Sequence, residues 1–364
     1  MRLTVVGNPG SRRVTLFLAA VRAAGLPEPW TIPWHDVASG APIRVGPGSL
    51  VRIDSPGEDA EVDRLLRGAP TAAEPGEIVG LAAWYRGLAA AVRRVESAAH
   101  AVGARLLSRP DDILTMFDKR ACHVRLAAAG VPVPPALPPP PTYADLRATM
   151  RDVGWPSVFV KPAHGSSASG VVALATAAGR VRATTSVELV RPGRLFNSLR
   201  VREYRREDDI ASIVDALAPH GLHVERWLPK AGLGGRVVDL RVVVIAGRPT
   251  HVVVRGSHAP MTNLHLGGER GDLAALRRAA GEASYGAALA TCARVAACFP
   301  GCLHVGVDLM FSADWRRHRV AEVNTFGDLL PGLRDDNGRD TYGAEVDALL
   351  ADRFQPTTLA GAPA

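Results

Sequence analysis

The chain has 364 residues, of which 47% are hydrophobic, so it can bury a normal core and is long enough for two or three domains. Its net charge of +7 comes from arginine, because the only lysines are Lys119, Lys161 and Lys230. An arginine surplus reflects either genome composition or an anionic ligand such as a nucleotide, a carboxylate or nucleic acid. The sequence has no compact basic run with interleaved aromatic residues, which disfavours nucleic acid as a partner.

The sequence also bears on the cellular compartment. No apolar stretch reaches the roughly 18–20 residues that a membrane span needs, and residues 1–7 run into an apolar strand without the features of a signal peptide. We therefore expect a cytoplasmic protein without a membrane partner. Three of the four cysteines are close enough in sequence to leave a zinc site open, but the lack of a Cys-x-x-Cys pair favours free thiols at Cys122, Cys292, Cys298 and Cys302.

Residues 1–107 are predicted to form an N-terminal α/β domain. Strands over 2–7 and 49–53 each lead into a turn, and a helix follows each turn, over 13–24 and 58–68. Residues 81–107 are expected to form one or two closing helices. Because α/β domains bind ligands beyond the carboxyl ends of their strands, the nearby Arg12, Arg13 and Arg52 could bind an acceptor. Ordinary turns explain these segments equally well.

The remainder is predicted to form a smaller unit over 108–185 and a larger one over 186–364. After a helix over 117–130, the proline-dense segment 131–142 predicts a stiff extended connector, with a proline-rich ligand for a partner domain as the alternative. Helices are also predicted over 273–297 and 342–352. Strands are predicted over 157–160, 171–175, 222–228, 237–245, 251–255, 303–311 and 319–324, the last two as a hairpin.

The first chemical motif is a lysine followed by a loop of small residues between two predicted strands. It reads Lys161-Pro162-Ala163-His164-Gly165-Ser166-Ser167-Ala168-Ser169-Gly170. Small residues let backbone N–H groups approach phosphate oxygens, and the lysine adds positive charge. The segment is not a P-loop, because Gly-x4-Gly-Lys-Ser/Thr is absent and a strand follows it. A phosphate loop and an ordinary hairpin loop both remain open here.

The second motif is an oxygen-rich set near the C-terminal end: Asp308, Glu322 and Asn324. On paired antiparallel strands, Glu322 and Asn324 share a face and Asp308 can lie opposite them. Two carboxylates and an amide oxygen suit Mg²⁺, which takes few protein ligands and completes its shell with water and phosphate. Strand residues that face solvent are the alternative, which the apolar neighbours disfavour.

The third motif is Asp239-Leu240-Arg241, whose charged residues share one face of a predicted strand. An arginine on the same face as a carboxylate cluster could bind a γ-phosphate or a substrate carboxylate through both arms of its guanidinium. A structural ion pair is the alternative. Arg255 and Asn263 extend this polar set.

Taken together and in this order, the motifs of residues 110 to 333 resemble those of the ATP-grasp superfamily. The resemblance is strongest to the branch of the ribosomal-protein S6 glutamate ligase and the amino-group-carrier-protein ligases of lysine biosynthesis. The N-terminal segments look like a poorly characterised bacterial ATP-grasp family that is encoded beside a radical S-adenosylmethionine enzyme. The resemblance implies an α/β (α+β) ATP-grasp fold with an N-terminal Rossmann-like pre-grasp domain. It is carried by Asp118-Lys119, Val160-Lys161-Pro162 with its loop, Val224 to Lys230, Asp239 to Arg241, Arg255, Asn263 with Gly267-Gly268, Asp308, and Glu322 to Asn324.

The resemblance also implies roles for these residues. ATP would be bound by two lysines, the loop and a hinge, namely Lys119, Lys161, His164, Gly165, Ser166, Ser167, Ser169, Gly170, Glu225, Arg226, Trp227, Leu228 and Lys230. Two Mg²⁺ ions, with Mn²⁺ as a substitute, would be held by Asp308, Glu322 and Asn324. Arg241, Arg255 and Asn263 would act in catalysis. The sequence departs from the family at the hinge, where Arg226 and Lys230 stand near the expected acidic ribose contact.

The implied activity is ATP- and Mg²⁺-dependent ligation of a carboxylate to an amine through an acyl phosphate. The acceptor is either a peptide or a small molecule, and a homo-oligomer is left open. Three alternatives remain at this stage. They are a kinase of a small alcohol, a non-catalytic nucleotide-binding partner protein, and a nucleic-acid binder whose affinity falls steeply with salt.

Overall fold

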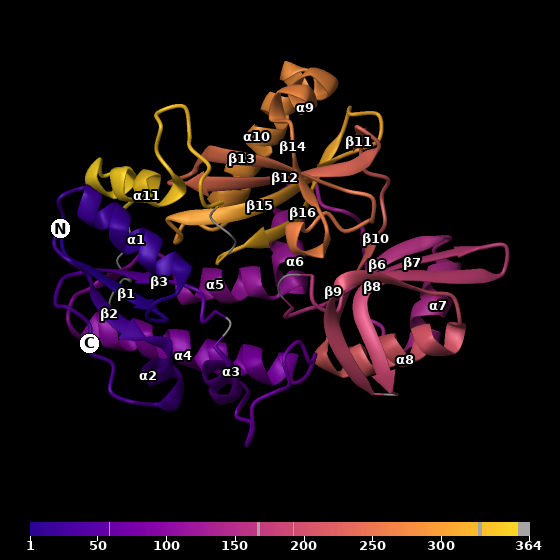
Figure 1. Ribbon diagram of the computed structural model, residues 1–364, viewed down its shortest axis with the longest axis horizontal. Helices are drawn as coiled ribbons and strands as arrows, with labels where there is room; N and C mark the ends of the chain where they lie inside the picture. The colour runs from indigo at the N-terminus through magenta and orange to yellow at the C-terminus, as the bar shows by residue number, and fades with distance from the viewer. Residues whose placement is uncertain (58, 166–167, 192, 327–329, 356–364) are drawn as a thin grey trace.

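The computed structural model describes residues 1–57, 59–165, 168–191, 193–326 and 330–355, which form three β-sheets with helices packed against them (Figure 1). Within these residues, no helix has the length and apolar character needed to cross a membrane. Ser166 and Ser167, two predicted phosphate-loop residues, lie outside the described residues.

The N-terminal domain is a parallel sheet in the order β2-β1-β3-β4. Its strands are β1 (Leu3–Gly7), β2 (Trp30–Pro33), β3 (Leu50–Ile53) and β4 (Arg105–Leu106). Its helices are α1 (Arg12–Ala23), α2 (Trp34–Ser39), α3 (Ala60–Arg67) and α4 (Leu81–Ala101). The predicted α/β alternation is confirmed. The prediction of helix up to residue 107 is wrong, because left-handed Gly103 turns the chain and residues 105–106 pair with β3.

The middle sheet has the order β5-β10-β6-β7-β8-β9 and is antiparallel throughout. Its strands are β5 (Ala136–Leu137), β6 (Ser157–Pro162), β7 (Val172–Ala177), β8 (Arg180–Arg191), β9 (Arg194–Tyr204) and β10 (Leu222–Arg226). Helices α7 (Tyr143–Asp152) and α8 (Glu207–Leu217) cover one face. Val158 and Val160 of β6 pack in the apolar core under these helices, whereas Phe159 and Lys161 line a cavity on the other face. The predicted boundary at residues 185 and 186 falls within β8.

The C-terminal sheet has the order β14-β13-β12-β15-β16. Its strands are β12 (Arg236–Ile245), β13 (Arg248–Ser257), β14 (Glu269–Gly271), β15 (His304–Phe311) and β16 (His318–Asn324), and β11 (Gly232–Leu233) pairs with β12. The helices are α5 (Pro110–Phe117), α6 (Lys119–Ala128), α9 (Leu273–Ala280), α10 (Glu282–Ala297) and α11 (Thr341–Leu350), with short 3-10 turns over Ala218–His220 and Leu264–Leu266. The predicted hairpin of 303–324 is confirmed. The predicted helix over 273–297 is interrupted at Gly281, which has φ +77°.

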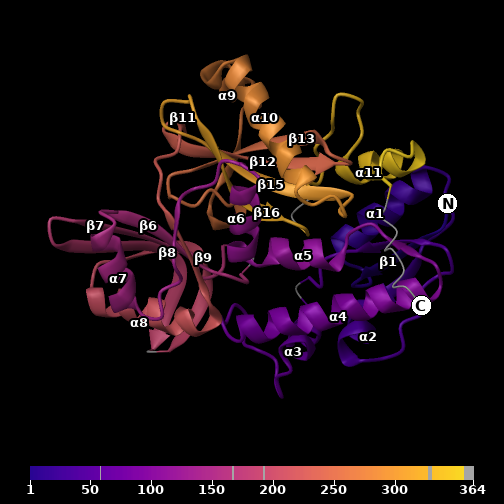
Figure 2. The same ribbon diagram turned by 180° about the vertical axis from the view of Figure 1, so that it is seen from behind.

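The two faces of β12 explain where charged residues are placed. Leu240, Val242 and Val244 pack in the core formed with α10, which lies in front of the sheet in the view of Figure 2. The opposite face carries Val243 and Ile245 at one end, where they share an apolar core with α1 and α11. Its other end lies outside that core and carries the charged side chains of residues 239 and 241.

The close packing of α3 and α4 gives a test of the N-terminal domain. A methyl group at Gly87 would lie 1.9 Å from the carbonyl oxygen of Leu66. We therefore expect Gly87→Ala to lower the free energy of unfolding by about 2 kcal/mol or more, because the two helices must separate. Urea unfolding of the full chain measures this. Gly286→Ala in α10 is the control, because a methyl group there meets no described atom within 4 Å and should stabilise the helix by up to about 1 kcal/mol. Equal unfolding curves for the two variants would contradict this account of the helix contact.

Candidate active site

A cavity of ≈ 730 Å³, which includes open solvent, is lined by residues of the middle sheet, the C-terminal sheet and α6. It brings together most of the residues that the sequence predicts for a nucleotide and metal site. These are Lys119, Lys161, Gly165, Ser169, Glu225, Arg226, Leu228, Lys230, Arg255, Asn263, Asp308 and Glu322. Five further described residues of the predicted site are not among those that line it: His164, Gly170, Trp227, Arg241 and Asn324.

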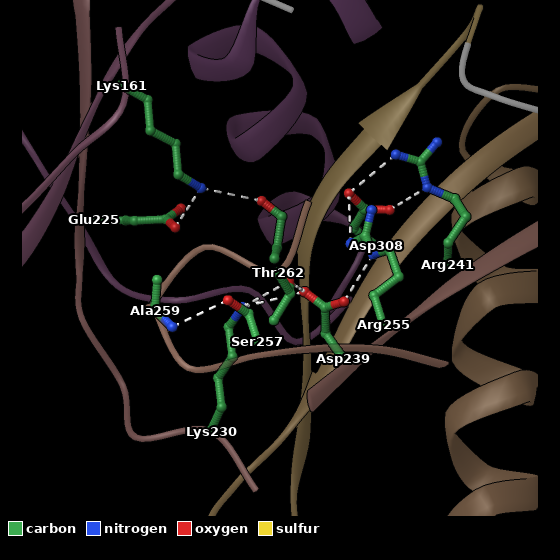
Figure 3. A network of polar contacts seen from close by, with 11 residues as sticks. Lys161, Glu225, Lys230, Asp239, Arg241, Arg255, Ser257, Ala259, Thr262 and Asp308 are labelled. Atoms are coloured by element: carbon green, nitrogen blue, oxygen red, sulfur yellow. Dashed lines mark hydrogen bonds and ion pairs between the residues drawn. The ribbon is translucent and has the colours of Figure 1, made fainter. Parts of the chain in front are cut away.

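One wall is a row of charged side chains on four neighbouring strands, and Figure 3 shows those on β13, β12 and β15. The strand register places Asp239 opposite Arg255, Arg241 opposite Asp308, and Asp308 opposite Glu322. Asp308 contacts both arginines. Its Oδ2 lies 3.2 Å from Nη2 of Arg241 and 3.1 Å from Nη2 of Arg255, and Nε of Arg241 donates to Oδ1. The period of two along each strand thus gathers these side chains on one face, as the sequence predicts.

Arg255 also contacts Asp239, which joins the row to Lys230. Nε of Arg255 lies 2.9 Å from Oδ1 of Asp239, and Nζ of Lys230 lies 3.1 Å from Oδ2. Burial opposes ionisation of Asp239, but Arg255 and Lys230 outweigh it and hold the pKa of this carboxyl well below its usual range. Burial also opposes the charge of Arg255, and the two carboxylates beside it raise its pKa. Lys230 further donates to Thr262, 3.3 Å away, so its ammonium belongs to this charged row.

The surroundings of the predicted metal ligands can be compared with what a cation needs. Asp308 and Glu322 face each other across the hairpin, and both have cations beside them, the two arginines and Lys119, whose Nζ is 3.2 Å from Oε1 of Glu322. Nδ2 of Asn324 is buried without a hydrogen-bond partner among the described residues. No group of three or more His, Cys, Asp or Glu side chains suited to a metal occurs there. Two carboxylates and an amide oxygen are ligand types that Mg²⁺ accepts, because it needs few protein ligands.

The opposite wall carries Lys161, whose Nζ lies 2.5 Å from Oε1 of Glu225 on the neighbouring strand. Nε2 of His223 lies 3.3 Å from the other oxygen of this carboxylate. Burial opposes ionisation of Glu225, but Lys161 and His223 outweigh it and lower its pKa to about 2. Burial lowers the pKa of His223 itself. Lys161 is therefore held on the cavity wall by a buried anion.

The predicted hinge, residues 225–228, is only partly exposed to the cavity. The backbone N–H of Arg226 donates to Pro135 over 2.8 Å, and that of Trp227 donates to Ser157 over 3.2 Å. The Trp227 ring packs against Phe159 with ring centres 5.3 Å apart. The backbone N–H groups of Arg226 and Trp227 are therefore used within the protein, and Leu228 lines the cavity.

The first residues of the predicted phosphate loop contact side chains of α4 and of the start of α6. Nζ of Lys119 donates to the carbonyl of Gly165. His164 lies away from the cavity lining. Its Nε2 is 3.1 Å from Oδ2 of Asp118, and its ring stacks on Tyr85 with centres 4.0 Å apart. Asp118 and Tyr85 were not predicted as site residues. Only the position of Asp118 at the start of a helix pointed to it.

The three N-terminal arginines do not lie together in one crevice. The guanidinium of Arg52 is buried beside Glu345 and lies 4.5 Å from the Phe17 ring centre. Arg13 donates to the carbonyl of Phe326, and Arg12 is exposed. Arg52 is therefore an internal residue in this structure. Among the cysteines, burial raises the pKa of Cys122, Cys292 and Cys302 to about 12, which disfavours their thiolate forms at neutral pH.

The Glu225 pair predicts a specific pH dependence of stability. Because the folded pKa of about 2 lies below the ordinary value of 4.5, the ionised carboxylate stabilises the fold above pH 4.5, and this contribution is lost as the pH falls toward 2. Glu225→Gln should be less stable than the wild type at pH 6. The difference in unfolding free energy should shrink by about 1 kcal/mol at pH 3.5. Urea unfolding followed by tryptophan fluorescence measures both values.

Glu282→Gln is the control for this experiment. Glu282 is an exposed carboxylate paired with Arg277, and solvent screening keeps the contribution of such a pair small. If both variants changed equally with pH, the buried pair would not be the cause.

Comparison with known proteins gives the fold. No protein-family model matches the sequence, and no curated protein matches it. The ATP-grasp ligase PsnB complexed with a minimal precursor is 19% identical, with a TM-score of 0.56 over 96% of this chain and 99% of that chain. D-cycloserine synthetase DcsG is 17% identical, with a TM-score of 0.56 over 98% and 100%. The D-alanine–D-alanine ligase from Bacillus anthracis complexed with ATP is 13% identical, with a TM-score of 0.52 over 97% and 98%. Because the likeness extends over nearly the whole of each chain, the protein has the ATP-grasp fold.

Proposed function

We propose that the protein is an ATP-dependent ligase that activates a carboxylate as an acyl phosphate and joins it to an amine. The observation that carries this proposal is that Lys119 and Lys161 line one cavity together with Asp308, Glu322 and Arg255. Such a set can bind a triphosphate with its cation, and phosphoryl transfer needs positioning and charge neutralisation more than covalent chemistry from the protein.

The nucleotide would occupy the cavity with its base at Leu228 and its phosphates at the two lysines. Lys161 is oriented by Glu225, so its ammonium is fixed on the wall before a ligand enters. Lys119 lies between Glu322 and the carbonyl of Gly165, which suits it to contact both the phosphates and the loop. The loop over 164–170 would then cover the phosphates and exclude water from the acyl phosphate.

Asp308, Glu322 and Asn324 would hold Mg²⁺. When bound, Mg²⁺ neutralises charge on the phosphate oxygens and polarises the transferred group. Nη1 of Arg241 is buried without a hydrogen-bond partner among the described residues, and its Nε and Nη2 donate to Asp308. Arg255 lies beside the same carboxylate, and Asn263 lines the cavity. Arg255 and Asn263 would bind the oxygens of the transferred phosphoryl group and of the carboxylate, and Arg241 would act through Asp308.

The reaction would then proceed in two balanced steps. A carboxylate oxygen of the substrate attacks the γ-phosphorus of ATP, and the bond to ADP breaks. An amine nitrogen attacks the acyl carbon, phosphate leaves, and the amine loses a proton. PsnB with its precursor and DcsG support either a peptide or a small molecule as the substrate class. A kinase that stops after one transfer to an alcohol is the second candidate, supported only by the shared phosphate chemistry.

The proposal is tested by measuring ADP release with Mg²⁺ and ATP against pools of carboxylates, amines, amino acids and peptides. Glu322→Gln should lower ADP release at least about 100-fold, because removal of one charge-stabilising group costs roughly 10²–10³ in rate. Hydroxylamine should trap the acyl phosphate as a hydroxamate. Mass spectrometry of the products gives a direct count of amide and phosphoester.

Glu269→Gln, an exposed surface change on β14, is the control and should retain wild-type activity. A stable phosphoester without hydroxamate would replace the ligase with the kinase. ATP binding without ADP release from any pool would support a non-catalytic protein. Undiminished activity of Glu322→Gln would remove the metal assignment.

A further inference from the structure

The backbone directly after Asn324 is held by two side chains from other parts of the chain. His304, the first residue of β15, lies with its Nε2 3.1 Å from the carbonyl oxygen of Thr325. Arg13 of α1 donates to the next carbonyl, that of Phe326. The end of the strand that carries two of the proposed cation ligands is therefore fixed by side chains outside the cavity.

His304 is itself the end of a buried chain of charges. Its Nδ1 lies 3.0 Å from Oε1 of Glu345 on α11, and the other oxygen of Glu345 accepts from Arg52 of β3. Nε of Arg52 lies 3.6 Å from Oδ2 of Asp54. All four residues are buried, Glu345 completely. The chain runs Asp54–Arg52–Glu345–His304 and connects the N-terminal sheet with the backbone beside Asn324.

The ring of His304 lies between two oxygens from different parts of the chain. A carbonyl oxygen can only accept a hydrogen bond, so Nε2 donates to Thr325. Burial opposes the charge of Glu345, but Arg52 and His304 outweigh it and lower its pKa. Nδ1 therefore faces a buried carboxylate while Nε2 is bound to the backbone, and these two contacts orient the ring.

Burial of such a chain costs free energy and is a poor means of stabilising a fold. Each buried charge loses its hydration, and apolar residues of similar volume are often as stable as a buried ion pair. The rings of Phe17 and Tyr342, which belong to an apolar core, lie beside Arg52 of this chain. The chain can instead orient a ligand of the proposed metal site, because side chains that hydrogen-bond around a metal site orient its ligands.

We propose that His304, oriented by Glu345 and Arg52, is a positioning residue that fixes the carbonyl of Thr325 and so orients Asn324 toward the cation. This inference rests on the proposed function, because it requires that Asn324 bind a cation. It assigns a role in the site to the C-terminal helix α11 and to β3, neither of which lines the cavity.

The test is the affinity of the protein for Mn²⁺ in the presence of ADP, measured by electron paramagnetic resonance of the free ion. His304→Leu removes both contacts and should weaken Mn²⁺ binding at least about 10-fold, the lower end of the effect of residues that orient metal ligands. His304→Gln can still donate to Thr325 and should restore most of the affinity. Glu345→Gln should show an intermediate loss, and it carries the test if His304→Leu does not fold.

Thr4→Val is the control for a general loss of stability, because Thr4 is fully buried in the N-terminal sheet and its hydroxyl lies 2.8 Å from that of Ser49. It should destabilise the fold and leave Mn²⁺ affinity unchanged. If the wild type binds Mn²⁺ with ADP but His304→Leu and Glu345→Gln bind it within twofold of the wild type, the positioning role is overturned. If the wild type itself binds no Mn²⁺ in the presence of ADP, the proposed function is overturned, and the positioning role is overturned with it.

Discussion

The ion pairs around Asp308 set the arrangement of the whole site. A carboxylate buried in a sheet must have cations beside it, because the free energy lost with its hydration is otherwise not recovered. Arg241 and Arg255 supply those cations from the two strands on one side. Each arginine needs an anion in turn, and Asp239 then needs Lys230. The row of charges is therefore a consequence of burying one acid in this sheet.

The second wall follows the same rule with different residues. Lys161 is paired with Glu225 of the middle sheet, and Lys119 of α6 is paired with Glu322 of β16. Lys161 and Lys119 thus each place a point charge beside one carboxylate, whereas Arg255 bridges two carboxylates with its planar guanidinium. An anionic ligand that entered between the walls would meet preformed cations and would compete with carboxylates for them.

The sequence predicted the strands that carry the candidate site better than it predicted the segments between them. The hairpin of Asp308 and Glu322, the strand of Asp239 and Arg241, and the lysine before the loop were all found, because two-residue periodicity places side chains on a face whatever the rest of the chain does. Residues 178–217 received no prediction. They form β8, β9 and α8, and the pattern of β9 is broken by an irregularity in its pairing with β8. Contacts made over long sequence separations could not be foreseen. His164 stacks on Tyr85, and Arg52 pairs with a glutamate 293 positions away.

The proline-rich connector bears on how the cavity can open. Its carbonyls at Pro132 and Pro135 accept from Val320 of β16 and Arg226 of β10, so this short segment is bonded to both sheets. Three residues of extended chain span at most about 11 Å, and prolines resist coiling into other shapes. While these two bonds persist, the sheets cannot slide apart at this edge. Relative movement of the two sheets at this edge is then limited to rotation about the connector.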